Sequence, residues 1–333
     1  MTIKDIAKEC GCAIGTVSRV LNNHPDVSNK TRERVLAVVK KYNFVLNANA
    51  KSLKSQERKN IIVVVKGSSS PLLNSLLECL QKKLELLPYT VSVVVLDEND
   101  DEVKNAVRLY YEQKPAGFIF LGGLAEKYTE DFNRVKVPCV LITTSAASIN
   151  NEFLSSISID DEKAAYFVTD HLIKMGHKKI GVIGGKMDSE VTCARYKGFL
   201  KAMEENSLPF DFESSYEVSR YSMESGFTAT EKLIKKNKDF TAIFTMSDVM
   251  AIGTIRKLTE LGFKVTDDIS VTGFDGLSLG EFYCPRLSTV RQNEEEMIEK
   301  GLAVFLGSVE KSEKSVHLYV PFEFVEGESI KKL

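Results

Sequence analysis

Three polar side chains at helical spacing carry the most informative chemistry in this sequence. Thr16, Ser18 and Arg19 lie on one face of the segment 14–21, opposite its apolar residues. A short hydroxyl side chain can approach a base edge closely, and a guanidinium can donate hydrogen bonds to a guanine or to a phosphate. These residue types predict a helix that binds in the major groove of DNA.

The elements that must position this face are two short helices joined by a turn. Gly11 falls between them, and glycine adopts the positive φ of a tight turn at little cost. The apolar residues on either side recur at helical spacing, namely Ile3, Ile6 and Ala7, then Val17, Val20 and Leu21. The pattern predicts a helix-turn-helix, although any small amphipathic helical pair has the same periodicity.

The charge distribution favours DNA binding over generic helix packing. Residues 1–60 contain 12 Lys and Arg against 5 Asp and Glu, a net charge of +7. The whole chain contains 44 against 46, so residues 61–333 hold 32 against 41, a net charge of −9. A basic segment attached to an acidic remainder indicates a polyanionic partner for that segment alone.

From residue 61 onward, apolar runs alternate with amphipathic stretches. A first set contains the strand-like runs IIVVV, TVSVVVL, GFIFL and CVLIT, the last of which closes it. A second set begins after ISIDD and contains KIGVIGG, YEVS, AIFTM and ISVTGF. Continuous apolar strands separated by helices are typical of parallel sheets covered on both faces. Two such doubly wound units predict an α/β body of two lobes with a ligand crevice between them.

Motifs of enzymes and cofactor sites are missing from the sequence. It has no G-x-G-x-x-G after the first strand, no G-x-x-x-x-G-K-[ST] and no G-x-S-x-G. The histidines and cysteines, including Cys10 and Cys12, do not have zinc-site spacing. We therefore expect a protein that is not an enzyme and has no cofactor or metal. No apolar run could span a bilayer and no secretory leader is visible, so we expect a cytoplasmic, nucleoid-associated protein.

Ordered motifs extend along nearly the whole chain. The N-terminal part contains TIKDIAKECG, GTVSRVLN, VSNKTRERV and NANAKSL, and the remainder contains HLIKMGHKKIGVIGG, TAIFTMSDVMAIGTIRKLTELGFKVTDDISVTGFD and LSTVRQ. Together they resemble the lac repressor (LacI/GalR) family of bacterial transcription regulators.

The resemblance implies a domain organisation. It implies an all-α helix-turn-helix DNA-binding head over 1–46, a hinge helix or linker over 47–59, and a periplasmic-binding-protein-like body over 60–333. In the body, the N-lobe is expected over about 60–160 and 292–320, and the C-lobe over about 161–291 and 321–333. LSTVRQ and PFEFVEG are the candidates for the later crossings between the lobes.

The resemblance also assigns DNA contacts residue by residue. For Arg19, base reading, phosphate pairing and a salt bridge to the scaffold all stay open, and Ser28 is expected to cap the third helix. In the family, the hinge orders only on operator, pairs with its dimer mate and wedges a leucine into the minor groove, and Leu53 occupies that position. The assigned residues are Ile14, Gly15, Thr16, Ser18, Arg19, Asn29 and Thr31 in the head, and Asn47, Ala50, Lys51 and Leu53 in the hinge.

Effector contacts are assigned in the same way, and here the sequence departs from the family. Lys66 stands where an acid is common, and Thr144 and Ser145 replace the usual aspartate and arginine, so an anionic ligand is one expectation. A carbohydrate or phosphorylated sugar is the first expectation, with another metabolite or no ligand as alternatives. The assigned residues are Ser69, Ser70, Leu72, Arg195, Tyr221, Ser247, Asp248 and Asp275.

The expected mechanism is allosteric linkage. An effector that closes the two lobes would shift the hinges and change affinity for the operator, whether by induction or by co-repression. A palindromic operator requires a two-fold protein, so we expect a homodimer. The rival hypothesis is a cytoplasmic sugar-binding protein without a DNA-binding role, which leaves the charge of +7 unexplained.

The hinge leucine gives the first testable prediction. Leu53→Ala should weaken operator binding by more than about tenfold and leave ligand binding unchanged, because the wedge that kinks the DNA is lost. Fluorescence anisotropy with labelled operator DNA measures the first effect and calorimetry the second. Unchanged operator affinity would mean that Leu53 packs against the body instead.

Overall fold

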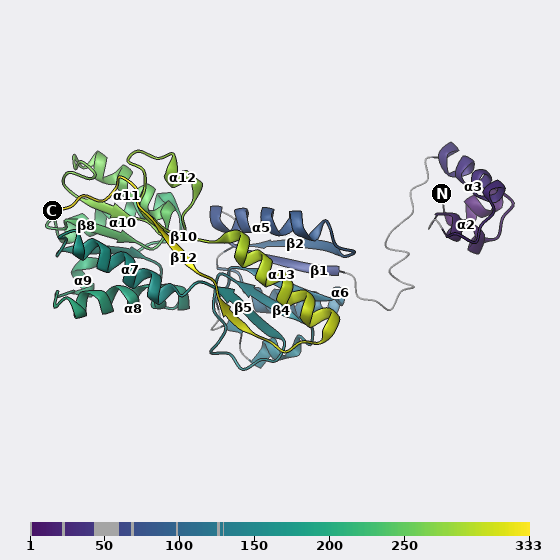
Figure 1. Cartoon of the computed structure of the whole chain (residues 1–333), viewed down its shortest axis with the longest axis horizontal. Helices are drawn as coiled ribbons and strands as arrows, with labels where there is room; N and C mark the ends of the chain where they lie inside the picture. The colour runs from purple at the N-terminus through teal and green to yellow at the C-terminus, as the bar shows by residue number, and fades with distance from the viewer. Residues whose placement is uncertain are drawn as a thin grey trace. The chain divides into compact units, whose positions relative to one another are not determined.

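The computed structural model describes residues 2–21, 24–42, 60–67, 70–97, 99–124, 127–128 and 130–333. These residues belong to two compact units, Met1–Arg58 and Lys59–Leu333, each drawn in Figure 1. Five residues with a predicted contact lie outside the described residues: Asn47, Ala50, Lys51, Leu53 and Ser69.

The first unit is a small bundle of α1 (Ile3–Glu9), α2 (Ile14–Leu21) and α3 (Asn29–Lys41). Gly11 has a φ of +60°, which confirms the predicted turn between α1 and α2. The hydroxyl of Ser28 accepts a hydrogen bond from the backbone N–H of Thr31 and so caps α3, as predicted. The core of this unit consists of Ile6, Ala7, Cys10, Val17, Val20 and Val35.

The second unit contains three sheets among its described residues. Its strands are β1 (Asn60–Lys66), β2 (Thr90–Leu96), β3 (Gly117–Leu121), β4 (Cys139–Ile142), β5 (Leu154–Ser158), β6 (Ile180–Gly184), β7 (Tyr216–Val218), β8 (Ala242–Thr245), β9 (Ser270–Thr272), β10 (Thr289–Gln292), β11 (His317–Tyr319) and β12 (Phe322–Val325). The orders are β11-β5-β4-β3-β1-β2 and β7-β6-β8-β9, both wholly parallel, and β10 pairs with β12 in antiparallel orientation. This confirms the predicted two-lobed α/β body.

Helices cover both faces of each parallel sheet. They are α5 (Pro71–Leu84), α6 (Glu102–Gln113), α7 (Asp161–Lys174), α8 (Glu190–Glu205), α9 (Phe212–Ser215), α10 (Met223–Lys236), α11 (Asp248–Glu260), α12 (Ser278–Glu281) and α13 (Glu294–Lys311), with a 3₁₀ turn at Glu130–Arg134. In the C-lobe, α7 packs on α8 and α10 packs on α11, with the sheet between the two pairs (Figure 1).

Alternating residues of the N-lobe strands enter two separate cores. On β1, Ile61, Val63 and Val65 pack with α5 and α13, whereas Ile62 and Val64 pack with α6. Both faces of the strand are therefore buried, which explains why β1 is a continuous β-branched run.

The N-lobe sheet extends beyond the predicted first set of strands. The segment LSSIS is β5, although its serines argue against a buried strand. The structure buries them because their hydroxyls are bonded: Ser156 Oγ lies 2.9 Å from His317 Nδ1, and Ser155 Oγ accepts from Val316 N–H at 3.1 Å. The partners are over 150 residues away along the chain, so local sequence does not reveal them.

The strands β10 and β12 cross between the two lobes (Figure 1). They lie within the segments LSTVRQ and PFEFVEG that were predicted for this role. Among the helices of the described residues, none has the length and apolar character needed to cross a bilayer.

The close packing of α7 on α8 gives a second prediction. A β-carbon at Gly198 would lie 2.0 Å from the carbonyl oxygen of Glu162, which is backbone and cannot move aside. Gly198→Ala should therefore lower the free energy of unfolding by about 1–3 kcal/mol, measured by urea denaturation. Gly301→Ala is the matched control, since the nearest atoms to its β-carbon belong to the side chains of Ile142 and Ile157 and not to the backbone. Equal stability of both variants would contradict this packing.

Candidate functional site

The exposed face of α2 carries the predicted DNA contacts of the first unit. The side chain of Ile14 is 47% exposed, Gly15 and Arg19 are exposed, and Thr16 and Ser18 are half-buried. Val17 and Val20 hold the opposite face in the core, so the hydroxyls and the guanidinium share the outer face. This is the arrangement that a major-groove helix requires.

Two further predicted contacts lie at the start of α3. Asn29 is exposed and Thr31 is half-buried, with its hydroxyl 2.9 Å from that of Ser28. Within the described residues, Arg19 makes no ion pair. The scaffold salt bridge considered for Arg19 is therefore not formed there, and base reading and phosphate pairing stay as the two predictions for its role.

The second unit has a cavity of about 200 Å³ between its lobes. The cavity lies at the carboxyl ends of parallel strands, which is where ligands bind in open α/β sheets. It is lined by Lys66, Gly67, Ser70, Leu72, Leu73, Gly122, Gly123, Leu124, Thr143, Thr144, Ser189, Val191, Arg195, Tyr221, Asp275 and Gln292. The structure thus brings five of the predicted effector contacts together: Ser70, Leu72, Arg195, Tyr221 and Asp275.

Arg195 is the central group of the C-lobe wall. Its side chain is almost fully buried, and its Nε lies 2.8 Å from Asp161 Oδ1 and its Nη2 3.7 Å from Asp275 Oδ1. A further N–H donates to the carbonyl oxygen of Met246, and the guanidinium lies 3.7 Å from the ring centroid of Phe274. A buried guanidinium needs such compensation, because an unpaired charge away from water is costly.

Asp275 is held in a conformation that few residues adopt. Its φ is +122°, and Thr143 across the cavity has a φ of +82°. Such backbone strain persists only where the surroundings enforce it, and it is common at functional sites. Gln292 Nε2 donates to Asp275 Oδ1 at 2.8 Å, while burial raises the pKa of Asp275 to about 7 against the opposing effect of Arg195.

Ser247 and Asp248, also assigned to the ligand, do not line this cavity. Ser247 caps α11 by accepting from Met250 N–H at 3.2 Å. Asp248 is fully buried, and its two oxygens accept from Leu277 N–H and from the hydroxyl of Thr289, both at 2.6 Å. Burial, reinforced by the charge of Asp275, raises the pKa of Asp248 to about 8. Asp248 supports the wall that carries Asp275 rather than facing a ligand.

Lys66 does not supply the free positive charge expected from the sequence. Its Nζ lies 2.5 Å from Oε2 of Glu102, a carboxylate with no exposed surface. The expectation of an anionic ligand therefore loses its basis, because the cation is already paired within the protein.

Sequence reasoning missed several groups of the site. Gln292 was taken only as part of a crossing strand, and Asp161 only as part of the ISIDD segment that precedes the second set. Both lie directly at an element boundary, Gln292 at the end of β10 and Asp161 at the start of α7. A polar residue at the end of a buried strand was the available signal for Gln292. Glu102 had no such signal, because its partner is distant along the chain.

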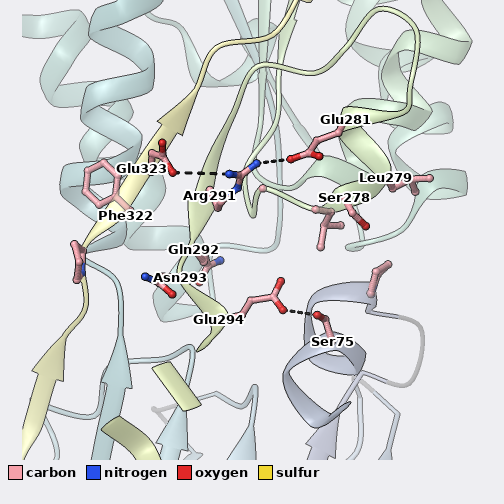
Figure 2. A pocket seen from close by; sticks show the side chains of 14 residues that line it. Ser75, Ser278, Leu279, Glu281, Arg291, Gln292, Asn293, Glu294, Phe322 and Glu323 are labelled. Atoms are coloured by element: carbon pink, nitrogen blue, oxygen red, sulfur yellow. Dashed lines mark hydrogen bonds and ion pairs between the residues drawn. The ribbon is translucent and has the colours of Figure 1, made fainter. Parts of the chain in front are cut away.

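A second cavity, of about 560 Å³, borders the same crossing strand (Figure 2). Gln292 lines both cavities. In the larger one, Arg291 pairs with Glu281 at 2.5 Å and lies 3.8 Å from Glu323, and both carboxylates are exposed (Figure 2). Water screens exposed ion pairs of this kind, so they contribute little to holding a ligand. We therefore place the candidate ligand site in the smaller cavity, whose charged side chains are buried.

Two parts of the chain match known families. Residues 2–47 match the family described as bacterial regulatory proteins, lacI family. Residues 169–330 match a periplasmic binding protein-like domain. In the part of the chain that is described, no group of His, Cys, Asp and Glu could hold a metal ion.

Similar proteins cover almost the whole chain. The HTH-type transcriptional regulator MalR of Clostridium butyricum is 35% identical over 99% of both chains. The HTH-type transcriptional repressor PurR of Haemophilus influenzae is 30% identical over 96% of this chain and 94% of its own. These relatives are regulators, in agreement with the prediction that the chain is not an enzyme.

Solved structures show the same architecture. The lac repressor dimer bound to operator and the anti-inducer ONPF superposes with a TM-score of 0.86, at 26% identity over 99% of this chain and 98% of that chain. The complex of the transcriptional regulator CelR with cellobiose shares the fold, with a TM-score of 0.74 at 23% identity over 99% of each chain.

The two buried carboxyls predict how stability depends on pH. Because the pKa values of Asp275 and Asp248 are raised to about 7 and about 8 from 3.8, the folded protein holds protons that the unfolded chain releases. The two raised pKa values add to the free energy of unfolding. This contribution is complete below pH 3.8 and is lost as the pH rises through about 7 to 8. The melting temperature of the ligand-free protein should therefore fall over that window.

Asp248→Asn tests this dependence. The variant should be less stable at acidic pH, because one amide cannot accept every donor that surrounds Asp248, but its melting temperature should change less between about pH 5 and about pH 9. Asp239→Asn, at an exposed pair with Lys179, is the control and should keep the wild-type slope. Parallel profiles for wild type and Asp248→Asn would contradict the role given to this group.

Proposed function

The chain belongs to the lacI family of bacterial regulatory proteins, and we propose that it represses transcription from a palindromic operator under the control of a carbohydrate effector. The observation that carries the proposal is the combination of an exposed polar face on α2 with a cavity of buried, paired charges between the lobes. A protein that only bound sugars would have no need of the first feature.

The N-terminal unit supplies affinity and specificity for DNA. Its net positive charge attracts the phosphate backbone whatever the base sequence, and the outer face of α2 reads base edges. Ile14, Gly15, Thr16, Ser18 and Arg19 are the proposed groove contacts, with Asn29 and Thr31 toward the phosphates. The hinge contacts at Asn47, Ala50, Lys51 and Leu53 remain predictions from the family resemblance.

A homodimer is part of the proposal. A palindrome presents two half-sites related by a two-fold axis, so two copies of α2 must be held about one helical turn apart. The similar lac repressor structure is that of a dimer on operator.

The cavity between the lobes is the proposed effector site. Arg195, Asp275 and Gln292 offer donors and acceptors on one wall, and Tyr221 offers a flat ring, which is the chemistry that binds sugar hydroxyls. Both lobes line the cavity, so a ligand that contacts both favours one relative arrangement of the lobes. Operator affinity then changes by the coupling free energy between the two sites.

Selection of an operator from random DNA sequences, followed by a salt titration, tests the proposal. We expect a palindromic consensus, and binding about a hundredfold or more tighter than to scrambled DNA and steeply weakened by salt. Arg19→Ala should reduce that preference, whereas Lys232→Ala on the acidic body should not. When neutral sugars are added one at a time, the effector should be the one that changes the affinity for the operator. Failure to select any sequence would overturn the DNA-binding role.

A further inference from the structure

Lys66 and Glu102 form a buried ion pair in the N-lobe wall of the cavity. Lys66 is the last residue of β1 and lines the cavity, with 8% of its surface exposed. Its ammonium carries three N–H donors, of which one is taken by Glu102 Oε2 at 2.5 Å. Within the described residues, Lys66 Nζ has no other hydrogen-bond acceptor, so its other donors are available to a ligand in the cavity.

Glu102 is fixed from two further directions. It is the first residue of α6, where the helix dipole favours a negative charge. Its Oε1 accepts from the backbone N–H of Leu124 at 2.7 Å, in the loop that follows β3. Three segments of the chain thus meet at one carboxylate that has no exposed surface, so Glu102 cannot turn toward solvent and release Lys66.

The pair removes net positive charge from this wall. A lone buried ammonium would attract an anionic ligand strongly, because charges interact more strongly in a medium of low dielectric constant. The opposite wall is compensated in the same way, since Arg195 faces both Asp161 and Asp275. Among the described residues that line the cavity, both cations, Lys66 and Arg195, already face carboxyl groups, so an incoming phosphate or carboxylate finds each of them paired.

We propose that Glu102 restricts the cavity to uncharged ligands by compensating Lys66, which stays free to donate hydrogen bonds to ligand oxygens. The inference deepens the proposed function, on which it rests, by choosing a neutral sugar over a phosphorylated one. Glu102 acts as a positioning residue, because it reaches the ligand only through Lys66.

Glu102→Gln tests the inference in the full-length protein. The amide is nearly the same size and keeps an oxygen for the N–H of Leu124, but Lys66 then keeps an uncompensated charge. Binding of glucose, ribose, cellobiose, glucose 6-phosphate and inorganic phosphate is measured by calorimetry. The wild type should bind a neutral sugar in preference to the phosphates. The variant should gain about tenfold or more in affinity for the phosphates, and salt should weaken that gain.

Two further variants separate charge from structure. Glu217→Gln changes another largely buried carboxylate, paired with Lys236 at 2.9 Å and outside the cavity lining, and should leave selectivity unchanged. Lys66→Met combined with Glu102→Leu replaces the pair by apolar groups and should gain no phosphate affinity. If this double variant gained as much as Glu102→Gln, the freed charge of Lys66 would not be the cause.

The outcomes distinguish this inference from the proposed function. Wild-type protein that binds a phosphate more tightly than the neutral sugars overturns the inference even if Glu102→Gln does not fold. A folded Glu102→Gln variant that gains no affinity for phosphate overturns it as well. If no sugar changes DNA binding, the carbohydrate effector is wrong, but a gain of phosphate binding by Glu102→Gln would still support the role of Glu102.

Discussion

The body depends on the compensation of charges that are buried where its two sheets face each other. Arg195 can lie away from water only because Asp161, Asp275 and the carbonyl of Met246 surround it. These partners come from the start of α7, the loop after β9 and the end of β8. One guanidinium therefore ties together three elements of the C-lobe, and a ligand that competes for its partners acts on all of them.

The crossing strand extends this network toward the other lobe. Gln292 donates to Asp275, and Thr289 donates to Asp248, so β10 is bonded directly to the groups behind and beside the cavity. Immediately after β10 the chain enters α13, which packs on α5 and on strands of the N-lobe. Under the proposed function, these main-chain connections and short hydrogen bonds would carry a change at the cavity to the N-lobe.

Much of the fold was predictable because its signals are local. The stripes of α1 and α2, the glycine turn and the cap at Ser28 depend on neighbours within a few residues, and the structure agrees with them. The continuous β-branched run of β1 likewise indicated a strand buried on both faces. The failures share a different feature. The strand LSSIS was not predicted, and Lys66 looked like an open anion site, because the partners that satisfy the buried serines and the lysine lie far away in sequence.

The sequence by itself determined the two-part organisation, the amphipathic character of α2, the parallel two-lobed body and five of the residues that line the cavity. Periodicity and net charge are sufficient for the first three, since both act over short distances or over whole segments, whereas the cavity residues were assigned from the family resemblance. The tertiary structure alone decided the electrostatics of the cavity. It placed Asp248 behind the wall, turned Asp275 inward and joined Lys66 to Glu102. The energy of a buried charge depends on which groups surround it in space, and these groups cannot be identified from their positions along the chain.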